Sequence, residues 1–172
     1  MTTTYRIAGL ADAPAVRALI ESGYRGDSAR QGWTNEADLL GGDRTTPEEV
    51  AAMIAAPEKR VLLAEQDGAL VGTVTITDLG NERAYMGLLC VSPTLQAGGL
   101  GRALVCEVEA LAAREFAARV MELIVVDVRT ELIAWYERRG YTRTGELRPF
   151  PLPMDVPYKM VVLERAIHQS GA

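Results

Sequence analysis

The chain has 172 residues, 48% of them hydrophobic and 24% charged, which predicts one globular domain, residues 1–172, with its core at about 4–166. A formal net charge of -5 leaves no broad basic surface, so we expect no nucleic-acid partner. No run approaches the roughly 18 apolar residues of a membrane span, and "MTTTYR" lacks the apolar core of a secretory signal, so we expect no membrane association and a cytoplasmic location.

Cysteine and histidine usage argues against metal and triad chemistry. Cys90 and Cys106 form no CxxC pair and have no nearby histidine, so we expect no metal site and interpret both as reduced core residues. The single histidine, His168, lies near the end of the chain. This placement disfavours a Ser-His-Asp triad.

The first third of the chain is predicted to contain one strand, two helices and a long loop. Residues 4–10 are typical of a strand, and "DAPAVRALIES" has helical spacing. Residues 23–44 are rich in glycine and polar residues, which predicts a loop of a length usually found in lids or binding loops. Thr46 and Glu49 form a capping box that begins the second helix.

The middle of the chain is predicted to form a β-meander. Two β-rich runs, 60–65 and 69–79, flank Asp67 and Gly68, a pair that strongly indicates a hairpin. A third run, 83–91, is almost continuously apolar. We therefore expect this strand to be covered on both faces.

The last part of the chain is predicted to alternate helices and strands. An apolar helical stripe follows the glycine-rich stretch and consists of Leu100, Leu104, Val108 and Leu111. A buried strand, "ARVMELIVVDV", precedes a short helix with Thr130 as a possible cap and Gly140 as its end. "YTRTGEL" and "PYKMVVLERAI" read as two last strands, and the prolines of "RPFPLPMDVP" between them exclude regular pairing. The order predicts a mixed α/β (α+β) domain with one central sheet.

Three glycines, Gly98, Gly99 and Gly101, stand at the mouth of the apolar helix. The first amides of a helix lack intrahelical partners, and glycine lets an anion approach them closely, so the stretch favours phosphate binding over a merely tight turn. Arg102 adds a positive charge at the first turn. The stretch is not a P-loop, which needs Lys-Ser/Thr after Gly101, nor a GxGxxG fingerprint, which needs glycine where Leu104 stands.

Gln96 to Gly101, a Q-x-x-G-x-G string after a strand ending in "VSP", resembles the acetyl-CoA-binding motif of the GCN5-related N-acetyltransferase (GNAT) superfamily. The segment "WYERRGY", 135–141, is similar to the "lYek.GF" segment of that family, and "YRIAGLADAPAVRAL" is similar to its first strand and helix. The likeness covers roughly residues 5–164. It implies a GNAT-like domain with a mixed, mostly antiparallel sheet of six to seven strands flanked by about four helices.

The resemblance implies that acyl-CoA lies in a gap where the strand before the glycine loop splays from the next strand. The backbone of Leu89 and Val91 would meet the pantetheine arm, and the amides of residues 96–103 would hold the pyrophosphate. Arg129 stands where the family often has asparagine, so that contact is lost or replaced by a charge contact to phosphate. The implied cofactor residues are Leu89, Cys90, Val91, Gln96, Ala97, Gly98, Gly99, Leu100, Gly101, Arg102, Ala103 and Arg129.

In the family the acceptor amine attacks the thioester directly, and Tyr136 matches the tyrosine that often protonates the leaving thiolate. Its phenol is protonated at pH 7 and able to donate, although Tyr136 also fits an aromatic packed beside Trp135. The fourth strand lacks the glutamate that many members use as general base. Four carboxylates are alternative bases, each of which also fits a solvated surface position: Glu36, Asp38, Glu122 and Asp127.

The loop between the first two helices usually borders the acceptor pocket in this superfamily, so we expect Trp33 and Glu36 to bind substrate. Trp33 fits a pocket wall or a core plug equally well, and Glu36 with Asp38 would favour a cationic amine. Residues 148–153 would form the opposite wall or a rigid connector.

The resemblance implies an enzyme that moves acetyl from acetyl-CoA to a primary amine of a small molecule. The alternatives are a protein N-terminus or lysine as acceptor, and a non-catalytic domain that binds or senses acyl-CoA. A homodimer, common in the family, is an allowed assembly.

Overall fold

The computed structural model of the chain describes residues 2–24, 45–151 and 155–168. One sheet has the strand order β1-β2-β3-β4-β5-β7-β6, and only the β4–β5 pair is parallel. Its strands are β1 (Thr3–Ile7), β2 (Lys59–Gln66), β3 (Ala69–Gly80), β4 (Arg83–Val91), β5 (Val120–Val126), β6 (Thr142–Pro149) and β7 (Lys159–Ala166). The described helices are α1 (Ala13–Tyr24), α3 (Pro47–Ala55), α4 (Leu100–Phe116) and α5 (Thr130–Glu137), with short 3-10 turns at Leu10–Asp12 and Pro93–Gly98. The predicted mixed, mostly antiparallel sheet is confirmed.

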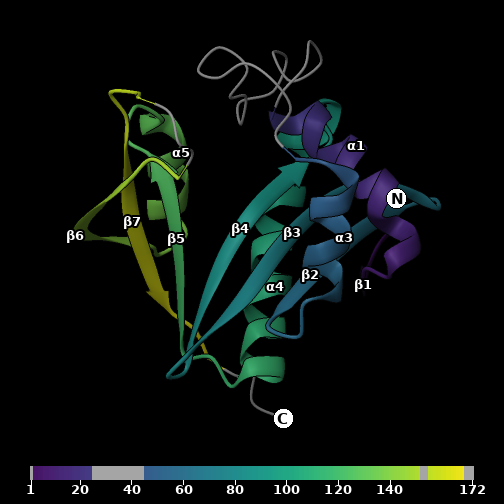
Figure 1. Cartoon of the computed structure of the whole chain (residues 1–172), viewed down its shortest axis with the longest axis horizontal. Coiled ribbons are helices and arrows are strands. Elements are labelled where there is room, and N and C mark those ends of the chain that lie inside the picture. The colour runs from purple at the N-terminus through teal and green to yellow at the C-terminus, as the bar shows by residue number, and fades with distance from the viewer. Residues whose placement is uncertain (1, 25–44, 152–154, 169–172) are drawn as a thin grey trace.

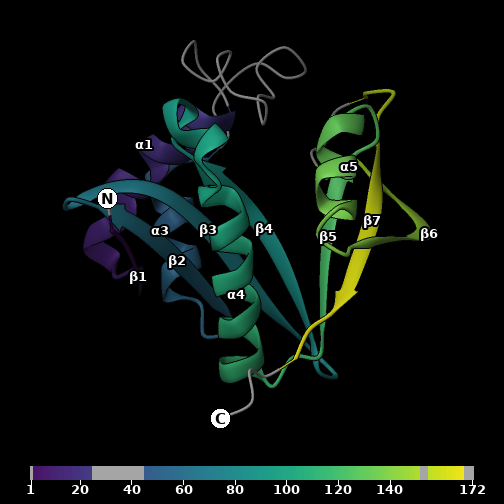
Figure 2. The same cartoon turned by 180° about the vertical axis from the view of Figure 1, so that it is seen from behind.

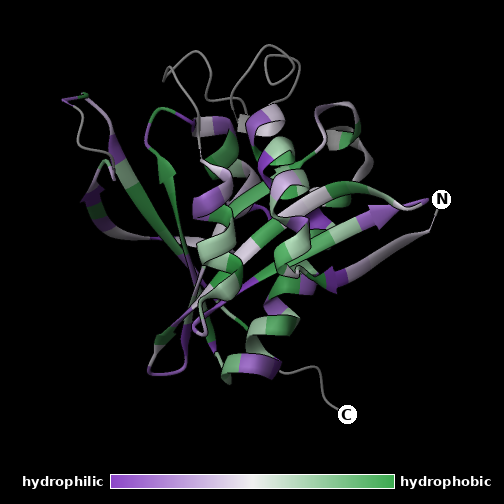
Figure 3. Cartoon of the chain, turned by 45° about the vertical axis from the view of Figure 1, so that its right-hand side comes forward, coloured by the Kyte–Doolittle hydropathy of each residue, from purple (hydrophilic) through white to green (hydrophobic). Residues whose placement is uncertain are grey.

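The helices cover the two faces of the sheet as two layers. Helices α1 and α3 lie on the face toward the viewer in Figure 1, and α4 and α5 lie on the face seen in Figure 2. Each layer has its own buried core, in which Val16 and Val50 represent the α1–α3 side and Leu104 and Leu123 the α4–α5 side. Apolar residues accordingly run along the strands and the inner sides of the helices (Figure 3).

Two local sequence signals are confirmed in atomic detail. The Thr46 hydroxyl accepts the Glu49 amide at 3.2 Å, and the Glu49 carboxylate accepts the Thr46 amide at 2.9 Å, which is the predicted capping box. Asp67 and Gly68 have φ of 50° and 77°, as a tight hairpin between β2 and β3 requires.

Two local expectations are wrong. Thr130 is not a cap, because α5 already begins at Thr130 and its N-cap is Arg129, which makes no side-chain capping bond. The prolines do not stop pairing at once, since Arg148 and Pro149 still pair with Met160 and Lys159 of β7. Strand β6 is an edge strand, where a missing proline amide can be tolerated.

The two cysteines have different environments. Cys90 is a buried core residue, as predicted: its Sγ donates to the Leu19 carbonyl at 3.3 Å, and burial raises the pKa of its thiol to about 12. Cys106 is exposed, so its assignment to the core is wrong. It lies on the outer side of α4, whereas Leu104 and Val108 of the same helix are buried.

In the described ranges, no helix has both the length and the apolar character needed to cross a membrane.

A buried ionic network ties α4 to the end of the sheet. Tyr141, which is buried, donates its hydroxyl to Glu109 at 2.7 Å, and Arg165 of β7 donates to the same carboxylate at 2.9 Å. Burial and the neighbouring Glu109 raise the pKa of Tyr141. Glu109 can therefore stand in an otherwise apolar helix face because both of its partners are in place.

We predict that Tyr141→Phe lowers the free energy of unfolding by about 1–2 kcal/mol, because Glu109 stays buried after losing a charge-assisted hydrogen bond. Urea denaturation measures this loss. Tyr158→Phe, which alters a half-buried tyrosine whose hydroxyl makes no hydrogen bond to another described residue, is the matched control and should change stability by less than about 0.5 kcal/mol. Equal stability of Tyr141→Phe and wild type would contradict the network's role.

Candidate active site

Strands β4 and β5 pair only at their beginnings and then diverge. Their register ends at Tyr85 opposite Glu122, although β4 continues to Val91 and β5 to Val126. Figures 1 and 2 both show the two strands separating from this point toward the glycine turn. We call the separated part the splay. Its two edges present backbone groups that do not pair with each other.

A β-bulge bends β4 inside the splay. Thr73 pairs with Cys90 and Thr75 with Gly87, so Leu88 and Leu89 together stand opposite Val74. Leu88 has φ of 50°, an uncommon value for a branched side chain. The bulge turns Leu88 toward the α1–α3 core and Leu89 toward the α4–α5 core.

The glycine turn presents an uncapped helix start. Gly99 is the N-cap of α4 with φ of 81°, a conformation that glycine adopts without strain, and it makes no side-chain capping bond. A Cβ added at Gly98 or Gly99 would have no neighbour within 4 Å. The start of α4 thus differs from that of α3, whose amide is occupied by Thr46. Open space beside a helix start that has no side-chain cap is the arrangement that suits an anion.

The structure brings most predicted cofactor residues together around this turn. Leu89 and Val91 lie at the end of β4, residues 96–98 belong to the 3-10 turn, and residues 100–103 form the first turn of α4. Arg102 is exposed there, whereas Leu100 is buried, so only the backbone of Leu100 can face a ligand.

Cys90, like Leu100, can face a ligand only through its backbone. Its side chain is buried beside Gly23 of α1, and it donates to a backbone carbonyl of that helix. Any contact between Cys90 and a ligand in the splay therefore involves its backbone.

Tyr136 of α5 is buried beside the splay, with 6% of its surface exposed. Its ring packs edge-on against Trp135 at 4.9 Å and Tyr141 at 5.7 Å between centroids. Burial is the main cause that raises the pKa of Tyr136, and Tyr85 adds to it, whereas Arg139 and Arg129 oppose it. Tyr136 therefore keeps its proton throughout the neutral range and can act as a donor.

Tyr85 lies on the opposite side of the splay from α5, on the face that carries α1 and α3. A Cβ added at Gly87 would stand 3.1 Å from Cε1 of Tyr85, so the tyrosine ring lies over this glycine. Thr75 donates to the Gly87 carbonyl at 2.9 Å beside the same ring. The ring of Tyr85 thus leans along β4 toward the separated part of the strand, and Tyr85 is one of the groups that raise the pKa of Tyr136. Sequence reasoning missed this residue.

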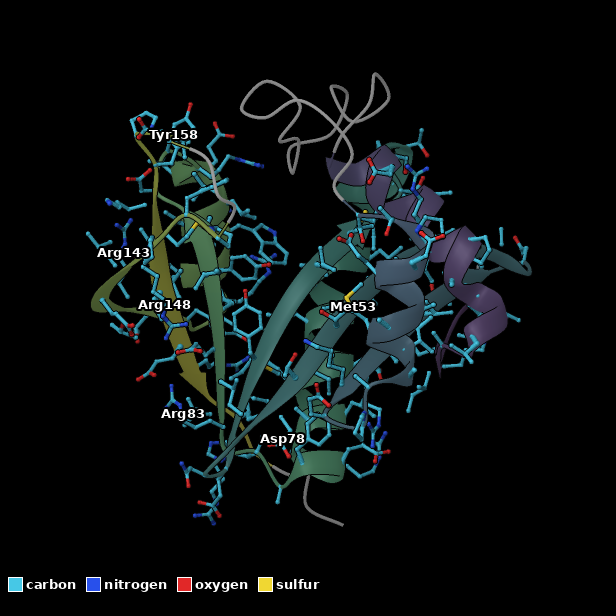
Figure 4. The ribbon with its side chains drawn as sticks, in the orientation of Figure 1. Met53, Asp78, Arg83, Arg143, Arg148 and Tyr158 are labelled. Atoms are coloured by element: carbon cyan, nitrogen blue, oxygen red, sulfur yellow. The ribbon has the colours of Figure 1, made fainter. Side chains whose placement is uncertain are left out.

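The carboxylate of Glu122 is occupied by arginine. Arg148 of β6 donates to both of its oxygens, at 2.7 and 3.3 Å, and Arg83 lies 3.8 Å away. Figure 4 shows Arg83 and Arg148 beside β5 and β7, across the diverging strands from Met53. Because both oxygens of Glu122 already accept hydrogen bonds from Arg148, the geometry disfavours Glu122 as general base.

Asp127 remains a candidate base, because its buried Oδ1 has no hydrogen-bond partner among the described residues. The other predicted acceptor-side residues, Trp33, Glu36 and Asp38, lie outside the described residues. In the part of the chain that the structure describes, no three His, Cys, Asp or Glu residues gather as a metal site.

Two arginines that the sequence did not single out lie next to the glycine turn. Arg139 stacks on Trp135, with its guanidinium carbon 3.8 Å from the ring centroid. Burial and the positive charges of Arg102 and Arg138 lower the pKa of Arg139. Trp135 in turn lies near Gly101 of α4, since a Cβ there would be 3.6 Å from the indole. The segment "ERRGY" contains two arginines, Arg138 and Arg139, but only the tertiary fold brings this segment near Arg102.

Comparison with solved structures shows the fold. The chain resembles the ribosomal-protein-S18-alanine N-acetyltransferase of Escherichia coli, with a TM-score of 0.73, 17% identity, and coverage of 99% of this chain and 97% of the other. The yncA protein of Salmonella typhimurium with its cofactor acetyl-CoA has a TM-score of 0.71 and 18% identity, and the match covers 100% of this chain and 98% of the other. A spermidine N-acetyltransferase chimera from Vibrio cholerae and hSSAT has a TM-score of 0.72 and 14% identity, and the match covers 96% of this chain and 96% of the other.

A search of curated protein sequences found no match. The model of the acetyltransferase (GNAT) family, in contrast, matches residues 29–141, which include the splay, the glycine turn and Tyr136. The predicted resemblance is thereby confirmed, and the chain belongs to the GNAT family of acetyltransferases, enzymes that take their acetyl group from acetyl-CoA.

Proposed function

We propose that this acetyltransferase transfers acetyl to a primary amine of a small molecule by direct attack in a ternary complex. One observation carries the proposal: two tyrosines reach the splay from opposite faces of the sheet, Tyr136 from α5 and Tyr85 from β4. The uncapped start of α4 lies at the end of the same opening. A thioester held at the opening would thus meet an amine from the α1–α3 face.

The residues present fit acetyl-CoA. The amides at the start of α4 and the guanidinium of Arg102 would hold the pyrophosphate, for which Gly98 and Gly99 leave open space. The end of β4, at Leu89 and Val91, would run beside the pantetheine arm. Orientation of the thioester by these contacts supplies much of the expected rate enhancement.

The proton balance assigns a role to both tyrosines. An acceptor that arrives as an ammonium first loses one proton to solvent; the neutral amine nitrogen then bonds to the acetyl carbon, the carbon–sulfur bond breaks, the nitrogen loses one further proton and the sulfur gains one. Tyr136 would donate to the sulfur, but its raised pKa makes it a weak acid unless its oxygen is reprotonated at the same time. Tyr85 would accept the amine proton and pass its own toward Tyr136, so no carboxylate on β4 is needed.

Charges beside the splay support a cationic acceptor. Three carboxylates, Glu122, Glu146 and Glu164, gather around two guanidinium groups, Arg83 and Arg148, at distances of 2.7–3.8 Å. The excess negative charge would attract an alkylammonium group and raise its local concentration. Polyamines and amino acid amides are therefore the first acceptors to test. A peptide N-terminus is the second, and the name of the Escherichia coli neighbour, a ribosomal-protein-S18-alanine N-acetyltransferase, supports including it.

The proposed function is tested by free-thiol release from acetyl-CoA across polyamines, amino acids, aminoglycosides and peptides. We expect turnover with at least one small amine and product masses that show a single added acetyl. Turnover with peptides alone would indicate that the acceptor is a protein and not a small molecule. Binding of acetyl-CoA without turnover for any amine would favour a sensing domain.

Gly98→Glu should raise the Kd for acetyl-CoA by about tenfold or more, because a carboxylate would face the expected pyrophosphate. Gly98→Gln is the matched neutral control and should stay within about threefold of wild type, since a side chain at Gly98 has open space. Isothermal titration calorimetry measures both. Similar acetyl-CoA affinities for the two variants would contradict the proposal that this turn holds the pyrophosphate.

Tyr136→Phe should lower kcat by about 100-fold and leave the Kd for acetyl-CoA nearly unchanged, as expected for loss of a proton donor. The raised pKa of Tyr136 means that the donor form persists below, at and somewhat above pH 10. The wild-type rate should therefore not fall between pH 7 and about 10 through loss of this acid. A kcat within twofold of wild type would exclude the role.

Tyr85→Phe should lower kcat by about tenfold or more with little change in the Kd for acetyl-CoA, since the ring over Gly87 is kept and only the hydroxyl is lost. If the two hydroxyls act in one relay, the Tyr85→Phe/Tyr136→Phe double variant should be no slower than the worse single variant. Multiplicative losses would indicate two independent roles.

A further inference from the structure

The ring of Tyr136 is held by neighbouring rings and not by its own hydroxyl. No hydrogen bond joins that hydroxyl to another described residue. Two aromatic rings pack edge-on against it, Trp135 at 4.9 Å and Tyr141 at 5.7 Å between centroids. The final side-chain torsion of a tyrosine has a broad energy minimum, so the direction of the Tyr136 oxygen depends on how firmly these neighbouring rings are fixed.

The backbone at the end of α5 places Tyr141 against Tyr136. The Tyr141 amide donates to the Tyr136 carbonyl at 3.2 Å, and the Gly140 amide donates to the Glu137 carbonyl at 3.0 Å. With Gly140 at a φ of 93°, these two bonds make a Schellman motif. The residue after the glycine in this motif commonly packs on the side chain five positions earlier, which here sets one tyrosine ring against the other. A shift of Tyr141 is therefore passed directly to Tyr136.

Tyr141 is fixed in turn by a charged group on another helix. Its hydroxyl donates to Glu109 of α4 at 2.7 Å, and Arg165 of β7 donates to both oxygens of that carboxylate, at 2.9 and 3.2 Å. Tyr141 exposes 2% of its surface and Glu109 9%, so water competes little for these bonds. Apolar packing on Tyr136 would need only the ring of Tyr141, whereas the hydroxyl is what joins that ring to α4.

We infer that Tyr141, anchored by Glu109 and Arg165, is a positioning residue that directs the hydroxyl of Tyr136 into the splay. The inference rests on the proposed role of Tyr136 as proton donor. In this role Tyr141 acts only through the ring of Tyr136 and not on the substrate. Misplacement of a reacting group by about 1 Å can lower a rate about 100-fold, so a small rotation of the Tyr136 ring is enough to slow the reaction.

A double-variant cycle tests the inference. Tyr141→Phe should lower kcat about tenfold and leave the Kd for acetyl-CoA within about twofold of wild type. In the Tyr136→Phe background the same change should lower kcat by less than about twofold, because no hydroxyl remains to be directed. Gly68→Ala controls for lost stability: a side chain at its φ of 77° strains the hairpin between β2 and β3, away from the splay, and kcat should stay at the wild-type value.

Two variants of Glu109 give an independent check in which the Tyr141 side chain is kept. Glu109→Gln retains an oxygen that can accept from the Tyr141 hydroxyl, so kcat should stay within about threefold of wild type. Glu109→Leu removes that acceptor, and kcat should fall about tenfold with little change in the Kd for acetyl-CoA. Equal kcat values in the two variants would overturn the inference.

A kcat of Tyr141→Phe within twofold of wild type would also overturn the inference. The same holds for an equal loss in the wild-type and Tyr136→Phe backgrounds, because an effect that does not pass through Tyr136 is a general structural one. These results would leave the proposed function intact. A Tyr136→Phe variant with wild-type kcat would instead overturn the proposed donor role and this inference together.

Discussion

The whole site depends on the point at which β4 and β5 stop pairing. Parallel strands in a sheet normally continue side by side, and here the register ends after Tyr85 and Glu122 although both strands go on. The bulge at Leu88 bends β4 at that level, and α5 fills the other side of the opening with Tyr136 and its aromatic neighbours. The sheet is therefore interrupted where a ligand can take the place of the missing strand contact.

The interruption also separates two electrostatic environments. Behind the sheet, the start of α4 and its nearby arginines form a positive region in a chain whose formal net charge is -5. In front of the sheet, Glu122 and its neighbours form a network with excess negative charge. A polyanionic donor and a cationic acceptor are thus favoured on opposite faces, and the opening is where they can meet.

Signals confined to a few consecutive residues predicted the structure well. The Thr46–Glu49 capping box and the Asp67-Gly68 turn depend on local backbone geometry, which a short stretch of sequence determines. The glycine turn belongs to the same class, because Gly99 needs its positive φ whatever the rest of the chain does.

Features made by distant segments could not be predicted in the same way. Arg138 and Arg139 read as an ordinary charged helix end until α5 is placed beside Arg102. Tyr85 read as one more strand residue, since only the register shows that it stands at the last β4–β5 pair. Cys106 failed for a different reason: it stands two residues from both Leu104 and Val108, so helical periodicity already places it on the face opposite the apolar stripe, where the structure has it exposed.

Burial of Tyr136 imposes a condition on the chemistry. A buried phenol keeps its proton securely, which suits a donor, but the raised pKa that secures the proton also opposes its release to a thiolate. The release becomes favourable only if the proton is replaced as it leaves, and the replacement must come from the opposite face, where the amine loses one. In the proposed reaction, the splay would let the proton that the amine loses on the face of Tyr85 be relayed toward Tyr136, so the gap that would admit the thioester would also connect the two protons of the reaction.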